Sequence, residues 1–262
     1  MVSLTNQPTH CLSSPRSDVE TRQPAISQPA ISQPAIWAIV PLKALESAKQ
    51  RLANVLSAEE RRLLMLAMAR DVLTALARSS HLSGTLIVSR TPEADVLAQA
   101  FGTERFAEKP DADLADALKQ GADYLRDYLD AEGVFIVPAD IPLLKADEVD
   151  AALSSHRRVT IMPDDEKLGT NGLILTPGDA IPLLFDGKSF RPHLQSARDR
   201  GLDPDICPLP GFELDIDTPA DLVTLLRSNR QTQTSIYLDK SGIAARLADH
   251  HNGPPNGGHP GP

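Results

Sequence analysis

The chain has 262 residues, enough for one large α/β domain or two small ones. Its formal net charge of −9 argues against a protein that binds nucleic acid without sequence preference, because such proteins carry basic patches. Two cysteines without paired spacing argue against a disulfide framework or a zinc site, and no apolar run is long enough to span a membrane. The first residues lack the apolar core of a secretory signal. We therefore expect a cytoplasmic protein whose partners include neither nucleic acid nor membrane.

Both ends of the chain differ in composition from its middle. Residues 1–35 carry the repeat QPAISQPAISQPAI, in which a proline every five residues forbids a helix. Residues 229–262 are polar and finish in HHNGPPNGGHPGP. Segments of this kind bury too little apolar surface to fold by themselves. We predict a disordered arm over 1–35, one folded domain over 36–228 and a disordered tail over 229–262.

Strand and helix patterns alternate within the middle segment. Short apolar runs predict strands at 37–40, 85–89, 134–137, 159–162, 173–176 and 212–214. Helical spacing and capping signals predict helices at 63–76, from 92, from near 145, at 113–129, at 190–200 and from 219. This alternation is typical of an α/β fold with a Rossmann-like, mostly parallel sheet covered by helices on both faces.

The run VFIVPADIP at 134–142 is the clearest of the expected strands. Pro138 and Pro142 end it, because proline cannot donate to a strand ladder and restricts the residue before it. Asp140 then lies just past the carboxyl end of a central strand, where open α/β sheets bind ligands. A carboxylate there suits a metal ion or a ligand hydroxyl. The alternative is that Asp140 forms a turn or caps the helix that begins near Lys145.

The connection after the first expected strand is rich in cations. Lys43, Lys49 and Arg51 lie within nine positions, and the glycines of a dinucleotide fingerprint are absent. Three such charges would offset part of the negative charge of a triphosphate. The alternative is a solvated polar segment.

Two more acids follow the strand expected at 212–214. If the strand continued, its alternation would point Asp215 and Asp217 to the same face. Mg2+ is usually held by one or two carboxylates together with substrate phosphates and waters. Asp140 and Asp217 are therefore a plausible metal-binding pair, and Asp215 is our candidate for a capping or pairing role.

The segments 168–173 and 186–190 carry small residues that suit an anion. GTNG at 169–172 offers backbone N–H groups and the Thr170 hydroxyl, a small anion nest. Gly187 and Ser189 precede a helix whose N-terminus would hold a phosphate, although the rest of a P-loop is missing. His193 is interpreted as a packing residue or a phosphate neighbour and not as a catalytic base.

Six segments together resemble the 2-phospho-L-lactate guanylyltransferases, whose relatives use phosphoenolpyruvate or 3-phospho-D-glycerate, in biosynthesis of the deazaflavin coenzyme factor 420. They occur in the family's order and are VPLKALESAKQRLANVLSAEER (40–61), AMARDVLTAL (67–76), FIVPADIPLL (135–144), GTNGL (169–173), DGKSFRPH (186–193) and DIDTPADL (215–222). The resemblance implies that the 36–228 domain has a nucleotidyltransferase fold of the glycosyltransferase-A type and depends on Mg2+.

The resemblance also implies roles for the residues singled out above. Asp140 and Asp217 match the family's metal-binding and catalytic aspartates. The positions that match the nucleotide-phosphate loop are Lys43, Lys49 and Arg51, and those that match the acceptor-binding region are Thr170, Gly187 and Ser189.

The implied reaction is attack of the acceptor's phosphate on the α-phosphorus of GTP, with loss of pyrophosphate. The acceptor would be a small phosphorylated three-carbon acid, and its unstable product suggests a downstream transferase as a partner. The chain departs from the family at Ala115 and at Asp186 and Lys188, where relatives carry asparagine and glycines. Alternatives are another nucleotidyltransferase of this fold, of the molybdopterin or sugar-phosphate type, or a non-catalytic nucleotide-binding regulator.

Overall fold

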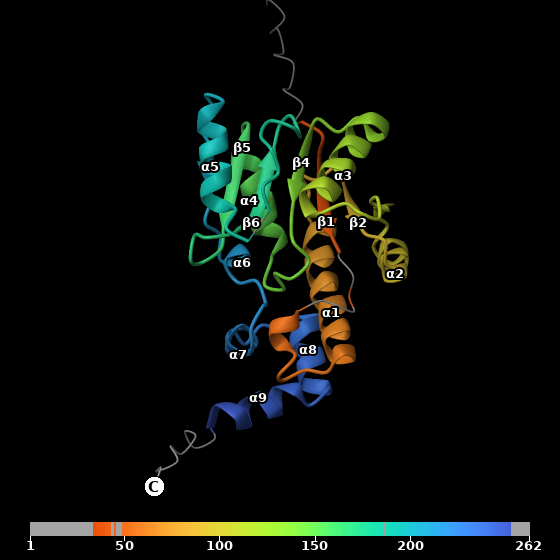
Figure 1. Ribbon diagram of the computed structural model, residues 1–262, viewed down its shortest axis with the longest axis vertical. Coiled ribbons are helices and arrows are strands. Elements are labelled where there is room, and N and C mark those ends of the chain that lie inside the picture. Colours follow the sequence, from red (N-terminus) through yellow and green to blue (C-terminus); the bar gives the residue numbers. More distant parts are fainter. Residues whose placement is uncertain (1–33, 43–44, 46–48, 186, 253–262) are drawn as a thin grey trace, which may run out of the picture. The chain divides into compact units, whose positions relative to one another are not determined.

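The computed structural model of the protein describes residues 34–42, 45, 49–185 and 187–252 (Figure 1). Apart from its last two residues, the arm predicted over 1–35 lies outside these ranges, as do Lys43 and Asp186.

The described residues form a seven-stranded sheet with strand order β3-β2-β1-β4-β6-β5-β7. The strands are β1 Ile36–Pro41, β2 Gly84–Val88, β3 Glu104–Phe106, β4 Gly133–Ile136, β5 Val159–Pro163, β6 Thr170–Leu175 and β7 Asp205–Ile206. Strand β1 pairs in parallel with both β2 and β4, and only β6 runs antiparallel to its neighbours among these strands. The prediction of an α/β fold with a mostly parallel sheet is confirmed.

Helices cover both faces of this sheet (Figure 1). They are α1 Ala58–Ala77, α2 Pro92–Phe101, α3 Leu114–Leu129, α4 Ala146–Ser155, α5 Phe190–Asp199, α6 Pro210–Glu213, α7 Pro219–Arg227, α8 Gln233–Lys240, α9 Ile243–Asn252 and the short 3-10 helix η2 Gln50–Leu52. Strand residues alternate between the two layers: Ala38 and Val40 pack with α1, α2 and α4, while Ile39 packs with α3 and α5.

The capping signals in the sequence operate as expected. Ser57 and Glu60 form a capping box at the start of α1, and Thr218 and Asp221 form another at the start of α7. Asp113 caps α3 by accepting a hydrogen bond from the backbone N–H of Asp116. These local bonds fix where the helices begin, which in turn places the connections that precede them.

The strand predicted at 212–214 is wrong, because these residues belong to α6 and the extended segment after it. Pro210 occupies the first position of that helix, where its missing N–H costs nothing. Phe212 is fully buried, with its ring centroid 6.0 Å from that of Phe135. A single buried residue in a three-residue window is compatible with a helical turn as well as with a strand, so the pattern alone did not decide. The sequence pattern also missed the strands β3 and β7, which are short and contain no buried residue that would give a strand pattern.

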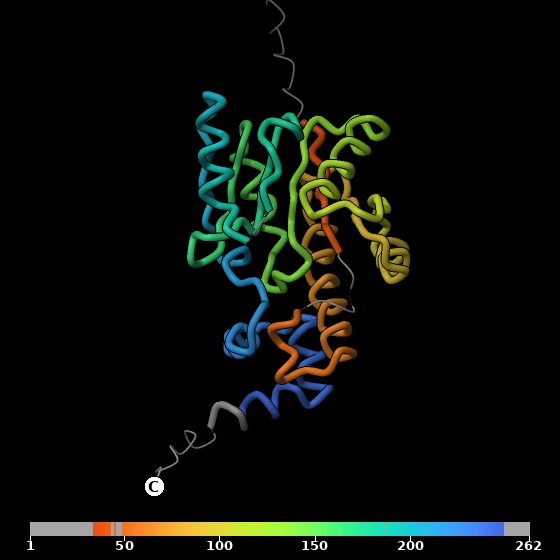
Figure 2. The backbone as a smooth tube through the Cα atoms, in the orientation of Figure 1, coloured from red at the N-terminus to blue at the C-terminus, as the bar shows by residue number. Residues whose placement is uncertain are grey.

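The disordered tail predicted from residue 229 is also wrong for residues 233–252. Helix α8 packs on α1 (Figure 2). Leu238 and Ile243 are fully buried in the same core. Asp71 of α1 accepts hydrogen bonds from the backbone N–H groups of Gln233 and Thr234, at 2.7 and 2.9 Å. The few apolar residues of this segment suffice because α1 already provides a surface to dock on. No helix in the described ranges is both long enough and apolar enough to cross a membrane.

Replacing Leu238 with Ala is expected to destabilise the protein by about 2–5 kcal/mol, because it leaves a cavity between α8 and α1. The matched control is Lys240→Ala on the exposed side of the same helix, which should change stability little. The free energy of unfolding from urea titration measures both. Equal, small effects of the two variants would show that α8 is not part of the cooperative core.

Candidate active site

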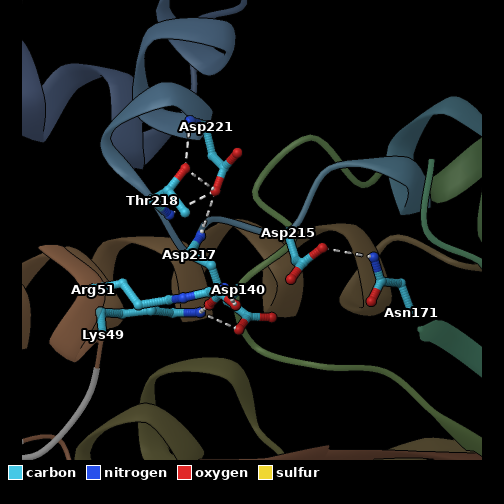
Figure 3. A network of polar contacts seen from close by, with 8 residues as sticks. All are labelled: Lys49, Arg51, Asp140, Asn171, Asp215, Asp217, Thr218 and Asp221. Atoms are coloured by element: carbon cyan, nitrogen blue, oxygen red, sulfur yellow. Dashed lines mark hydrogen bonds and ion pairs between the residues drawn. The ribbon is translucent and has the colours of Figure 1, made fainter. Parts of the chain in front are cut away.

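The candidate site lies beyond the end of β4, where the segment before α7 is bonded to the turn that carries Asp140, and Figure 3 shows its side chains. The backbone N–H of Ile216 donates to the carbonyl of Asp140 at 3.0 Å, so the 214–217 segment is fixed beside the turn that follows β4. This bond joins two segments of the chain whose bonded residues, Asp140 and Ile216, are 76 positions apart in sequence. Asp140 does not cap α4, whose N-cap residue is Lys145. The alternative capping role for Asp140 is therefore wrong.

Lys49 lies between two of the predicted acids. Its Nζ atom is 2.5 Å from Asp140 Oδ2 and 2.7 Å from Asp217 Oδ1 (Figure 3). The Lys49 side chain is only 8% exposed, whereas that of Asp217 is 41% exposed. The backbone of Lys49 has a left-handed conformation, with φ of 52°, immediately before η2. The two carboxylates therefore converge on a single positive charge.

Opposing effects set the pKa of Lys49. Burial by itself would lower the pKa of the ammonium group, because it removes water from the charge. The charges of Asp140 and Asp217 and their hydrogen bonds outweigh burial and hold the pKa above its ordinary value. Arg51, which is 73% exposed, lies 3.6 Å from Asp217 and adds a second cation at the open side. Lys49 therefore keeps its charge at any physiological pH.

Asp215 has a larger part in the site than the sequence indicated. Its Oδ1 atom accepts a hydrogen bond from Asn171 Nδ2 at 3.2 Å (Figure 3). Burial, followed by the negative charge of Asp140, raises the pKa of Asp215 above its ordinary value. Asp221 caps α7, so the capping role considered for Asp215 is wrong. The sequence signal for a role of Asp215 was its spacing of two residues from Asp217. The segment that carries both residues is not a strand.

The segments expected to bind an acceptor also lie together. Thr170 begins β6 and is buried, and Ser189 is buried at the N-cap position of α5. The backbone N–H of Phe190 donates to the carbonyl of Leu168 at 3.0 Å, which holds the two segments side by side. Gly187 has a φ of 88°, a left-handed conformation that favours glycine. Asn171 connects these segments to the acid cluster through Asp215.

Part of the anion nest predicted at 169–172 is already occupied by another side chain of the protein. The carboxylate of Asp164 accepts from the backbone N–H groups of Leu168 and Gly169, at 2.8 and 2.7 Å. Thr170 pairs with Pro163 and Gly172 pairs with Met162 of β5, whereas Asn171 lies at the register shift between these pairs. Of this motif, the Thr170 side chain remains the candidate for contact with a ligand. The amide of Asn171 is also used, by the carbonyl of Phe212 and by Asp215.

The acids suit a cation that is completed by a ligand. Within the described ranges, no three His, Cys, Asp or Glu side chains are arranged to hold a metal ion by themselves. Asp140 and Asp217 nevertheless reach one common cation, and one or two carboxylates are what Mg2+ uses when phosphates and waters supply its other ligands. The donor set therefore fits a metal–nucleotide complex better than an isolated metal ion.

A cavity of about 780 Å³ lies elsewhere, between α3 and the 176–183 loop. Its walls include Gly133 and Val134, at the start of β4, and none of the acids described above. It is therefore at the opposite end of this strand from Asp140. Geometry and charge favour the acid cluster as the chemical site, since ligands of open α/β sheets bind at the carboxyl ends of strands.

Comparison with known proteins identifies the family to which this chain is similar. The family model described as "Guanylyl transferase CofC like" matches residues 36–253. A phosphoenolpyruvate guanylyltransferase from Sphaerobacter thermophilus is 39% identical over 191 residues, which cover 72% of this chain and 91% of that protein. A 2-phospho-L-lactate guanylyltransferase from Methanothermobacter thermautotrophicus is 36% identical over 205 residues, covering 78% and 89% of the two chains.

Solved structures support the fold. A Desulfovibrio desulfuricans protein assigned as a nucleotide-diphospho-sugar transferase superposes with a TM-score of 0.67 at 22% identity, covering 81% of this chain and 97% of the other. A nucleotidyl transferase from Methanothermobacter gives a TM-score of 0.54 at 16% identity, with 74% and 99% covered. The expectation of a nucleotidyltransferase fold of the glycosyltransferase-A type is confirmed.

Replacing Asp215 with Asn is expected to stabilise the ligand-free protein at pH 7. Because the pKa of Asp215 is raised in the folded state, folding favours the protonated carboxyl, and stability is lost as pH rises from the ordinary value of 3.8 through the folded pKa. An amide removes that loss and still accepts from Asn171. Urea titrations at pH 7 and pH 4 should show a gain at pH 7 that shrinks at pH 4.

The control for this prediction is Asp239→Asn on the exposed surface of α8. Its effect on the free energy of unfolding at pH 7 should be small. If Asp215→Asn were less stable than the wild type at pH 7, attraction to Lys49 would outweigh burial and the proximity of Asp140.

Proposed function

The chain belongs to the CofC-like guanylyl transferase family, and we propose that it transfers GMP from GTP to the phosphate of a small phosphorylated three-carbon acid. The observation that carries this proposal is the convergence of Asp140 and Asp217 on the Lys49 ammonium at the carboxyl end of β4. Relatives at 36–39% identity are named for phosphoenolpyruvate and 2-phospho-L-lactate. The product would enter biosynthesis of the deazaflavin coenzyme factor 420.

An oxygen of the acceptor phosphate forms a bond with the α-phosphorus of GTP, and the bond from that phosphorus to the bridging oxygen breaks. The electron pair of the broken bond leaves with pyrophosphate. A phosphate nucleophile is already ionised near neutral pH, so no side chain has to remove a proton. The task of the protein is to align the two substrates and to balance their negative charges.

Asp140 and Asp217 are the residues that would hold Mg2+, and the bound ion would supply positive charge to the triphosphate. Lys49 and Arg51 add fixed cations on the same side, which stabilise charge on the departing pyrophosphate. Lys43 has the same role on the basis of family resemblance, although it lies outside the described residues.

Thr170, Gly187 and Ser189 bind the acceptor. Their support is the contact between the 168–170 and 189–190 segments and the link from Asn171 to Asp215. The acceptor is phosphoenolpyruvate, 2-phospho-L-lactate or 3-phospho-D-glycerate. Lys188 borders this site where relatives have glycine, so it is the described residue at which acceptor choice would differ. Because the product is an unstable diphosphate diester, a downstream transferase would receive it.

A direct assay tests the proposed activity. Purified protein is mixed with Mg2+, one nucleoside triphosphate and one of the three acids, and pyrophosphate release is recorded for every combination. GTP with at least one acid should give turnover well above the other triphosphates. Preference for another triphosphate would indicate a different nucleotidyltransferase, and GTP binding without turnover would indicate a regulator.

Asp140→Asn and Asp217→Asn should each lower kcat on the order of a hundredfold or more, because each removes a carboxylate that would hold Mg2+ against the triphosphate. Asp239→Asn on α8 is the control and should retain the wild-type kcat. Circular dichroism melting shows whether the variants fold. Folded site variants with wild-type turnover would contradict the assignment.

Removal of divalent metal should abolish turnover, since the side chains alone supply too little positive charge for a triphosphate. Activity is measured after dialysis against EDTA and again after addition of excess Mg2+, with Ca2+ as a matched divalent control. Full activity after exhaustive chelation would show that Lys49 and Arg51 are sufficient without a metal ion.

A further inference from the structure

His193 is fully buried on α5, and its side chain contacts Thr170 and the loop that precedes Gly187. Its Nδ1 atom is 3.0 Å from Thr170 Oγ1, and its Nε2 atom is 2.9 Å from the backbone nitrogen of Leu184. The ring of Phe185 packs edge-on against the imidazole, with the two centroids 4.9 Å apart. One side chain therefore connects β6, the loop before Gly187, and α5.

The partners of the imidazole determine its tautomer. A backbone N–H is only a donor, so Nε2 of His193 accepts from Leu184 and carries no proton. The neutral ring then has its single N–H at Nδ1, which donates to Thr170 Oγ1. If the ring carried a second proton, it would be on Nε2, and this N–H would then face the backbone N–H of Leu184, so that two donors would oppose each other.

This tautomer has a consequence for Thr170. A hydroxyl has one hydrogen to donate, and the His193 N–H occupies an acceptor position on its oxygen. Within the described part of the chain, Thr170 Oγ1 has no second hydrogen-bond partner. Its O–H hydrogen is therefore directed away from His193 and remains available to an acceptor group. Anions such as a phosphate or carboxylate meet that requirement, and such charge-assisted bonds are the stronger ones.

We propose that His193 is a positioning residue that turns the Thr170 hydroxyl into a dedicated donor for the phosphate or carboxylate of the acceptor acid. The proposal rests on the acceptor-binding role of Thr170 in the proposed function. It assigns to His193 a role in recognising the acceptor, with no role toward GTP. It also explains why a histidine occupies a buried position of α5 that an apolar residue could otherwise fill.

Substitutions at position 193 separate the two hydrogen bonds. Asn places an amide N–H near the position of Nδ1, so His193→Asn keeps the donor to Thr170. Gln places its amide near Nε2, so His193→Gln keeps a partner for Leu184 and loses the donor to Thr170. Thr170→Val removes the hydroxyl and preserves the branched shape.

The test is a double-mutant cycle that measures the Kd of phosphoenolpyruvate and of GTP by isothermal titration calorimetry. Thr170→Val should weaken phosphoenolpyruvate binding on the order of tenfold to a hundredfold, as expected for a hydrogen bond to a charged group. His193→Gln should weaken it severalfold, and His193→Asn should restore most of the loss. In the double variant Thr170→Val/His193→Gln, binding should be no weaker than in Thr170→Val alone. GTP binding should not change.

The outcomes distinguish this inference from the proposed function. Independent, multiplying effects of the two substitutions, or equal losses for GTP and phosphoenolpyruvate, would show that His193 only supports the fold. If His193→Gln fails to fold, the folded His193→Asn variant decides, because weak binding in it would contradict the proposal. Wild-type protein that binds none of the three acids would contradict the proposed function itself.

Discussion

The structure of the site depends on one electrostatic constraint, which is that the carboxylates of Asp140 and Asp217 share the ammonium of Lys49. Two acids this close would repel each other without a cation between them. Lys49 resolves that repulsion from a strained position, because its backbone is left-handed and its side chain is almost completely buried. The same arrangement prepares the site for a substrate whose own negative charges require cations.

The remaining parts of the site are held by hydrogen bonds that leave few polar groups unused. The carbonyl of Asp140 accepts from Ile216, which fixes the segment carrying Asp215 and Asp217. Asn171 donates to Asp215 and to the carbonyl of Phe212, which connects the acceptor side to the acid side. Pre-organisation of this kind is what a reaction without a general base requires, because alignment and charge supply nearly all of the catalysis.

Asp215 shows that the arrangement of charges in this site is unfavourable for the stability of the ligand-free protein. Its carboxylate is partly buried next to Asp140, and its pKa is raised as a result. A residue that destabilises the empty site is expected where the surrounding charges are arranged for a ligand and not for the free protein. The sequence allowed a capping or pairing role for Asp215, but Thr218 and Asp221 form the capping box of the following helix. The local sequence pattern correctly indicated where α7 begins. It did not indicate that Asp215 lies beside Asp140, because that contact depends on the tertiary structure.

The sequence by itself determined the α/β architecture, most of the strands and helix starts, and the position of Asp140, because these follow from local periodicity, proline stops and capping pairs. It did not determine that 212–214 is helical or that 233–252 folds, because those outcomes depend on Phe212 packing beside Phe135 and on α8 docking against α1. Only the tertiary structure decided that Lys49 bridges the two acids and that His193 reaches Thr170. Such contacts join segments far apart in the chain, and no local pattern of residues encodes the distance between them.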